Sequence, residues 1–138
     1  PSSNNEIGLA PVPELQAHAT TLPYLAFLLG QTQLSTLIAS EGVCPVRVPV
    51  AERFAIHKMM VSQLRTNREA KSDKDIYQAA VLVAALGDLY PGAIEAAVGD
   101  APVSARRYLQ KALPLVMVHL EEHPRAAEEL EGAVQAGK

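Results

Sequence analysis

Residues 76–86 restrict the fold of this chain more than any other segment, because they are apolar almost all round after Gln78. A helix without a polar face is stable only where other elements bury it, so this segment predicts a central, buried helix. The preceding residues 72–75 have the S-x-x-D form of a capping box, and Gly87 follows the apolar run. We therefore predict that this helix opens at the capping box and closes at Gly87.

A second helical period runs through residues 49–68. The side chains of one predicted helical face recur there at spacings of three and four: Val50, Phe54, His57, Val61 and Leu64. Lys58, Ser62 and Arg65 follow on the adjacent stripe. The spacing predicts that Lys58 and Arg65 project in the same direction, two turns apart on one helix.

Three further helical segments are predicted in the C-terminal half. Residues 91–98 end before Gly99, residues 103–123 contain Pro114, which is expected to kink or divide the helix, and residues 125–136 are acidic and Ala-rich, typical of a solvated face. Together with the two helices above, these segments predict a helical bundle of four to five segments.

The N-terminal third has a different pattern. Residues 1–21 are Pro-containing and show little periodicity, which predicts an extended arm, and Thr20 and Thr21 are predicted to cap a short helix at 22–29. Two β-branched-rich runs at 34–39 and 43–48, separated by Ser-Glu-Gly, predict a β-hairpin in which Pro45 favours an edge position. The predicted fold class is therefore α+β and predominantly helical, with a short β-hairpin followed by the bundle.

The predicted organisation has three parts: an arm at 1–21, a helix plus hairpin at 22–48 that joins a missing upstream domain, and a helical domain at 49–138. The chain starts with Pro1 rather than Met, so we expect a fragment of a longer protein that self-associates through surface left uncovered. The single cysteine, Cys44, indicates a reducing compartment, and no apolar run reaches the roughly 20 residues needed to cross a bilayer. A cytoplasmic location without membrane contact is the expectation.

Charge is segregated along the chain. The first 46 residues contain no Lys or Arg, whereas residues 47–75 carry seven basic and four acidic side chains, a local net charge of +3 in a chain of net charge −3. The basic segment is thus a local patch, which argues against bulk nucleic-acid binding and favours a small polyanion such as a nucleotide. Lys58, Arg65 and Lys74 could converge on phosphate oxygens, and the alternative is a solvated basic face beside a structural cap.

Two motifs within this patch resemble a known family. The run Val-Pro-x-x-x-Arg-Phe-Ala-x-His-Lys at 48–58, followed by Lys-Asp-x-x-Gln-Ala at 74–79, is similar to the C-terminal half of a family of prokaryotic nucleotidyltransferase-fold proteins, distantly similar to abortive-infection nucleotidyltransferase toxins. The resemblance extends over roughly residues 9–113. It implies an upstream α/β domain with a Gly-Ser turn and aspartates that bind Mg²⁺, and a helical part that holds a nucleoside triphosphate or the acceptor.

The sequence lacks the upstream features that the resemblance implies. It contains no Gly-Ser pair, and its one Asp-x-Asp, at Asp73 and Asp75, is expected to begin a helix rather than to bind a metal. We therefore expect no catalytic residue and no metal ligand in this chain. The expected function is the nucleotide- or acceptor-binding part of a nucleotidyltransferase, inactive without its catalytic domain. The alternative is a non-catalytic module for interaction or oligomerisation.

The resemblance assigns roles to five residues. Lys58 and Lys74 would contact phosphate, and Arg65 would add a third cation. Asp75 would orient one of these bases or cap its helix, and Gln78 would bind backbone, Asp75 or the ligand.

Other candidate residues have simpler interpretations. His57 on the apolar helix face is interpreted mainly as a core histidine, and the alternative is a functional base. His119 and His123, at i and i+4, lack the Glu of a zinc-protease motif and are interpreted as a solvated helix end. Cys44 is expected to be a half-buried strand thiol.

Overall fold

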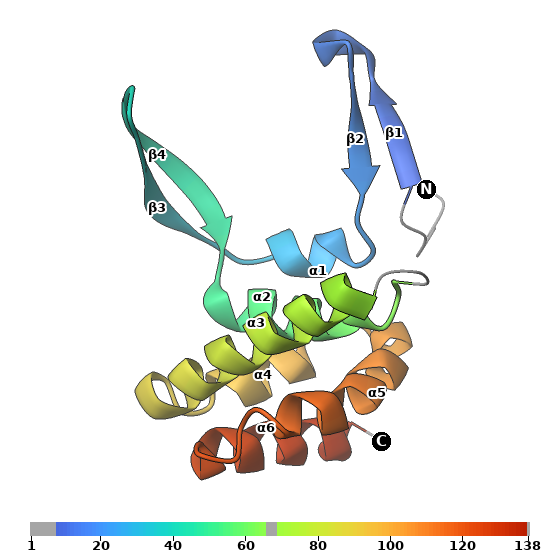
Figure 1. The fold of residues 1–138 in the computed structure, drawn as a ribbon, viewed down its shortest axis with the longest axis vertical. Coiled ribbons are helices and arrows are strands. Elements are labelled where there is room, and N and C mark those ends of the chain that lie inside the picture. The colour runs from blue at the N-terminus through green and yellow to red at the C-terminus, as the bar shows by residue number, and fades with distance from the viewer. Residues whose placement is uncertain (1–7, 66–68, 138) are drawn as a thin grey trace.

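The computed structural model describes residues 8–65 and 69–137, and it confirms an α+β fold that is predominantly helical (Figure 1). Within these residues the chain forms two β-hairpins, six α-helices and two 3-10 turns. In chain order they are β1 (Gly8–Val12), η1 (Pro13–Leu15), β2 (Ala17–Thr21), α1 (Leu25–Leu29), β3 (Thr32–Ala39), β4 (Gly42–Pro49), α2 (Ala51–Ser62), α3 (Glu69–Leu89), α4 (Ala93–Gly99), η2 (Val103–Ala105), α5 (Arg106–Met117) and α6 (Pro124–Ala136).

Helix α3 is the centre of the helical body, as the apolar run predicts. It packs against α2, α4, α5 and α6, and its side chains Ile76, Ala79 and Val83 belong to one continuous core with Ile56 of α2 and Leu130 of α6. Small side chains let these helices approach closely. The sequence therefore predicted both the existence and the central position of this helix.

The start of α3 corrects the predicted capping box. The helix already runs from Glu69, so Ser72 lies inside it, and the Ser72 hydroxyl donates to the carbonyl of Ser62 at the end of α2 over 2.9 Å. The predicted closure at Gly87 is also wrong, since α3 continues to Leu89. Gly87 has a packing role instead: a Cβ built there would lie 2.5 Å from Cβ of Ala126 in α6.

The helix is not buried on every side, which corrects the sequence interpretation. Tyr77, Val81 and Leu89 of α3 are exposed. Four neighbouring helices surround only part of α3, so the remaining side faces solvent. Helix α5 runs through Pro114, so the predicted division there is wrong, and the helix ends at Met117 rather than at residue 123.

The predicted hairpin at 34–39 and 43–48 is confirmed as β3 and β4, which pair antiparallel from Thr32↔Pro49 to Ala39↔Gly42. The predicted arm folds differently, because β1 and β2 form a second antiparallel hairpin, from Gly8↔Thr21 to Val12↔Ala17. Residues 1–7 of that arm lie outside the described residues. Thr21 therefore ends a strand, and α1 begins only at Leu25, after Tyr24 in a left-handed conformation (φ 58°) without a side-chain cap.

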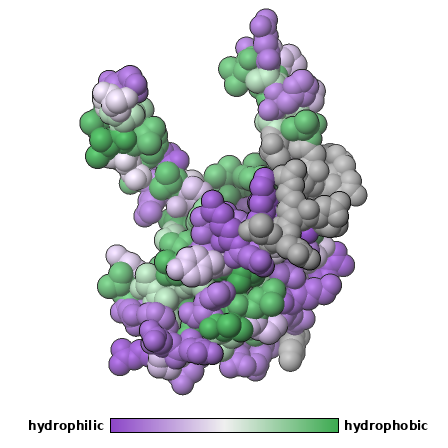
Figure 2. Space-filling model, in the orientation of Figure 1, coloured by the Kyte–Doolittle hydropathy of each residue, from purple (hydrophilic) through white to green (hydrophobic). Residues whose placement is uncertain are grey.

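Both hairpins project from the same side of the helical body (Figure 1). Among the hairpin residues whose side chains are described none is buried, whereas α1 at their base places Phe27 in the core of the body and buries Leu28. Figure 2 shows apolar side chains along both projections. Among the helices of the described residues, none combines the length and apolarity needed to span a membrane.

Candidate functional site

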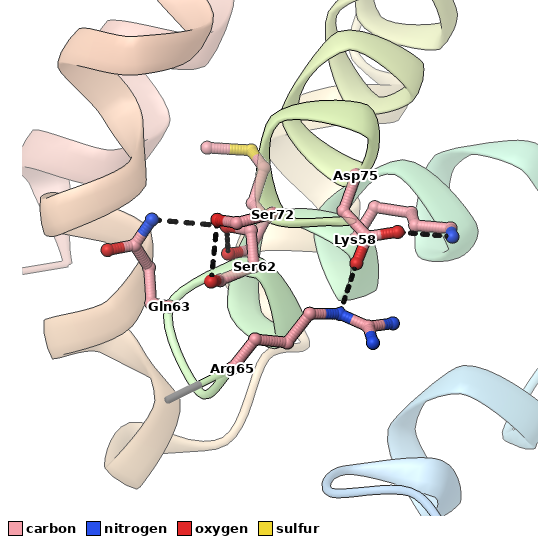
Figure 3. Close-up of polar contacts among 7 residues, drawn as sticks. Lys58, Ser62, Gln63, Arg65, Ser72 and Asp75 are labelled. Atoms are coloured by element: carbon pink, nitrogen blue, oxygen red, sulfur yellow. Dashed lines mark hydrogen bonds and ion pairs between the residues drawn. The ribbon is translucent and has the colours of Figure 1, made fainter. Parts of the chain in front are cut away.

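The carboxylate of Asp75, in the second turn of α3, is the centre of the polar site. It is nearly buried, with 5% of its side chain exposed, and its two oxygens accept from two different cations. Lys58 Nζ donates to Oδ1 and Arg65 Nε donates to Oδ2, each over 2.7 Å (Figure 3). One carboxylate therefore holds an ammonium and a guanidinium group beside each other.

A pocket of about 300 Å³ opens next to this carboxylate. Its lining contains all five residues proposed from the sequence, together with one more lysine: Lys58, Arg65, Lys71, Lys74, Asp75 and Gln78. Four cations and one carboxylate give this lining a net charge of +3. We call it the basic pocket. A concave surface with this charge suits a small anion with several oxygens.

Arg65 reaches the pocket by a different route from the one the periodicity predicts. Helix α2 ends at Ser62, and Arg65 follows a turn at residues 63–64, so the two cations do not lie on one helical stripe. Arg68, the predicted end of that helix, lies outside the described residues. The side chains of Lys58 and Arg65 nevertheless converge, because Asp75 accepts from both.

A small hydrogen-bond network fixes the end of α2 against α3. Ser62 Oγ donates to the carbonyl of Met59 over 2.7 Å, Gln63 Nε2 donates to Ser62 Oγ over 3.1 Å, and Ser72 Oγ donates to the carbonyl of Ser62 (Figure 3). The bonds to Met59 and to the Ser62 carbonyl satisfy groups that the helix end would leave without a partner. They also set the direction in which the chain leaves α2 toward Arg65.

Two residues of the first motif have structural roles. Arg53 Nη1 donates to the carbonyl of Phe27 over 2.8 Å, and its Nη2 forms an ion pair with Asp100. Four residues later, the ring nitrogen Nε2 of His57 lies 2.9 Å from the carbonyl of Pro23. Two side chains one turn apart on α2 thus bind two backbone carbonyls around α1. Through α1, they hold the segments that lead to both hairpins.

His57 is a buried structural histidine. Burial lowers the pKa of its imidazole, the hydrogen bond to Pro23 opposes this, and the nearby charges of Lys58 and Asp75 have small opposite effects. The neutral ring donates from Nε2 to the Pro23 carbonyl. This agrees with its interpretation as a core residue.

Comparison with known families bears directly on these motifs. A protein-family model described as nucleotidyltransferase matches residues 1–102, which include both hairpins and the whole basic pocket. The chain belongs to this nucleotidyltransferase family. No curated protein and no solved structure gives a match.

The aspartates of this nucleotidyltransferase family member do not fit a Mg²⁺ site. Asp75 uses both oxygens for Lys58 and Arg65, and Asp73 is exposed and does not line the pocket. The surrounding positive charge also opposes a divalent cation. Across residues 8–65 and 69–137, no group of three His, Cys, Asp or Glu side chains is arranged to hold a metal.

The remaining candidates lie elsewhere on the nucleotidyltransferase chain. His119 contacts the ring of Tyr77 edge-on, and His123 Nδ1 lies 3.8 Å from a carboxylate oxygen of Asp88, away from the basic pocket. The Cys44 thiol is exposed, so the expectation of a half-buried thiol is wrong. A two-stranded sheet with solvent on both faces has no layer to cover it.

Lys71 is the pocket residue that the sequence interpretation missed. It lies one turn before Asp75, and with Lys74 and Gln78 it occupies positions i, i+3 and i+7 of α3. It was missed because the helix was expected to start at the capping box, which excluded Lys71. Extending the helical spacing one turn backward would have placed it beside the other cations.

Proposed function

We propose that the basic pocket binds the phosphate groups of a nucleoside triphosphate for a nucleotidyl transfer reaction. The observation that carries this proposal is the shared carboxylate of Asp75, which holds Lys58 and Arg65 side by side at an accessible, net positive pocket. Membership of a nucleotidyltransferase family supports the choice of ligand.

The two central cations keep donors for a ligand. Lys58 has three N–H groups, of which one is directed to Asp75, and 20% of its side chain is exposed. Arg65 binds Asp75 through Nε, and its terminal nitrogens have no partner among the described residues. Its side chain is 23% exposed. The guanidinium fork suits a bidentate contact with phosphate, and the ammonium adds a point charge.

The residues of α3 would complete the contact. Lys71 and Lys74 are exposed at the rim, where they attract an anion over a distance of about one Debye length, roughly 8–10 Å at ordinary ionic strength. Gln78 is half-buried in the lining and could donate its amide to a phosphate or ribose oxygen. In this proposal Asp75 is a positioning residue, since its oxygens are occupied by the two cations.

The proposal divides the enzyme into two parts. Metal-assisted attack at the α-phosphorus would require carboxylates that hold Mg²⁺. The carboxylates around the basic pocket do not fit that role, so we propose that a catalytic α/β domain outside this chain supplies it. This chain would bind and orient the polyphosphate, and by itself it would be inactive.

Ligand binding by matched charge-removing variants tests this proposal. Binding of nucleoside triphosphates and of inorganic tripolyphosphate is measured by calorimetry on the intact enzyme carrying Lys58→Gln, Arg65→Gln or Lys111→Gln. Lys111 is exposed on α5 and outside the pocket, so its substitution removes the same charge. A lost charge-assisted hydrogen bond predicts affinity at least about tenfold weaker for the first two variants and unchanged for the third.

Two results would contradict the proposal. Equal weakening by all three substitutions would mean that only the overall charge matters. Unchanged affinity in Lys58→Gln and Arg65→Gln would place the nucleotide elsewhere. The unfolding midpoint of each variant is measured beside its affinity, so that a loss of binding is separated from a loss of folding.

A further inference from the structure

The β3–β4 hairpin has apolar side chains on both of its faces. Leu34 and Ile38 lie on one face, where Val43 is the cross-strand partner of Ile38, and Leu37 lies on the other. These four side chains are 56–77% exposed. A hairpin that packs one face on a core alternates apolar and polar residues, whereas strands covered on both faces are apolar throughout. This hairpin has neither pattern in full, but its exposed apolar side chains on both faces offer surface that a partner could bury.

The accessible surface of the chain is large for its size. It measures 8968 Å², whereas a folded monomer of 14.7 kDa exposes about 6,900 Å². The difference of about 2,000 Å² includes the surface of both projecting hairpins, and it exceeds the roughly 800 Å² that one partner of a standard interface buries. Much of the exposed apolar surface lies on the two hairpins (Figure 2).

The two edges of the hairpin differ in their free backbone groups. The Val50 N–H donates to the Gln31 carbonyl over 3.2 Å, one step beyond the terminal pair Thr32↔Pro49, so 31/50 is a hydrogen-bonded pair. Such pairs alternate along an antiparallel ladder. The residues between them therefore direct their backbone groups outward: Thr32, Leu34, Thr36 and Ile38 on β3, and Val43, Pro45, Arg47 and Pro49 on β4.

Proline blocks one edge and leaves the other open. Pro45 and Pro49 remove two donors from the outer edge of β4, whereas all four outward residues of β3 keep their N–H groups. Edge strands of monomers are commonly protected by Lys, and residues 8–46 contain no Lys or Arg. In the described residues, no third strand pairs with β3. The outer edge of β3 is thus an unprotected site for strand addition.

We propose that the outer edge of β3 pairs with the edge strand of the sheet in the nucleotidyltransferase catalytic domain. This inference rests on the proposed function, which assigns the metal chemistry to that domain. Strand addition would supply partners for the outward N–H and C=O groups of β3. The helices that cover an α/β sheet would then bury both apolar faces of the hairpin.

Charge favours the same partner. The first turns of α3, which carry Lys71, Lys74 and Asp75, lie at the side of the body from which the hairpins project (Figure 1). A domain docked on the hairpins would therefore lie near the helix turns that carry the basic pocket. A catalytic site with carboxylates and a bound triphosphate is strongly negative and complements the net charge of +3 there. A second copy of this chain carries the same net positive pocket and would bring no negative site to complement it.

Hydrogen exchange at residue resolution tests the docking. The amides of Thr32, Leu34, Thr36 and Ile38 are compared in this chain alone and in the intact enzyme, and the inward amides of residues 33, 35 and 37 serve as the internal reference. We expect the outward amides to exchange at least about tenfold more slowly in the intact enzyme. Equal exchange in both samples would overturn the proposal. Protection that rises with the concentration of this chain alone would also overturn it and assign the edge to a second copy.

Two proline variants sharpen this test in the intact enzyme. Thr36→Pro removes one outward donor from the β3 edge, and Arg47→Pro removes one from the β4 edge that is already interrupted. We expect Thr36→Pro to increase exchange at Leu34 and Ile38 toward the rates of the isolated chain, while Arg47→Pro retains the protection. The same response to both variants would contradict the assignment to β3.

The docking of β3 and the binding of nucleotide in the basic pocket can be tested independently, because each has its own measurement. Lys58→Gln should keep the protection of β3 while it weakens tripolyphosphate binding. Protected β3 amides with unaffected nucleotide affinity would overturn only the pocket assignment. Weakened nucleotide binding with unprotected β3 amides would overturn only the docking.

Discussion

The hairpins and the helical body of this chain differ in how far they bury their own side chains. In the body, α2 to α6 bury their own apolar side chains around α3, so the fold of that region is contained in its own sequence. In the hairpins, each strand finds one backbone partner, but no described side chain is buried. An isolated two-stranded hairpin is only marginally stable in water. The comparison teaches that local pairing can be complete where tertiary packing is still missing.

The sharpest test of this comparison uses the same substitution in both regions. Leu130 of α6 is fully buried, and Leu34 of β3 is 73% exposed. Leu130→Ala should lower the free energy of unfolding by about 2–5 kcal/mol because it leaves a cavity. Leu34→Ala should change it by less than about 0.5 kcal/mol. Urea unfolding of this chain measures the free energy of unfolding of both variants. Equal losses would contradict the stated difference between the body and the hairpins.

Glycine substitutions test how tightly the body is packed. Gly87→Ala places a Cβ against Ala126, so α3 and α6 must separate, and we expect a loss of about 1–3 kcal/mol. Gly132→Ala in α6 meets no atom within 4 Å and should instead stabilise the helix by about 0.5–1 kcal/mol. Thermal unfolding midpoints that move in opposite directions are the expected result. A neutral Gly87→Ala would show that the contact between these helices adjusts easily.

The basic pocket connects function to the stability of the body. Asp75→Asn leaves Lys58 and Arg65 close together without their shared carboxylate, and we expect a loss of about 1–2 kcal/mol, limited because both cations are partly exposed. Asp73→Asn, an exposed change two residues earlier, should be nearly neutral. Chemical denaturation compares the two, and an equally neutral Asp75→Asn would mean that the pocket is not held by this carboxylate.

The smallest expected effect concerns the pH dependence of stability that arises from His57, which binds the Pro23 carbonyl before α1. Burial lowers the pKa of His57 in the folded state, while the unfolded value is about 6.5. Below about pH 6.5 the unfolded chain binds more protons at this position than the folded chain. The free energy of unfolding is therefore retained above about pH 6.5 and falls as the pH decreases through the folded pKa of His57. The unfolding midpoint of His57→Gln, whose amide can still donate to Pro23, should fall less between about pH 7.5 and about pH 5.5. His18→Gln, exposed on β2, should keep the slope of the original chain.

Periodicity and residue type were sufficient for most of the fold. The apolar run after Gln78 identified the central helix, and the β-branched runs beside residues 40–42 identified the β3–β4 hairpin. These features depend on neighbours within a few residues, which a sequence displays directly. The β1–β2 hairpin was missed because Pro11 and Pro13 indicated an unpaired segment, and pairing across its turn leaves little periodic signal.

The site was only partly foreseeable for the same reason. The sequence and its family resemblance singled out five of the six residues around the basic pocket, since the two motifs place cations and Gln78 within a short stretch. Their arrangement required the packing of α2 on α3: Asp75 became the shared acceptor of Lys58 and Arg65 instead of a helix cap, and Lys71 joined them one turn earlier. Helix boundaries and ion pairs across helices depend on contacts between distant segments, and these form only when the burial of the core brings the helices together.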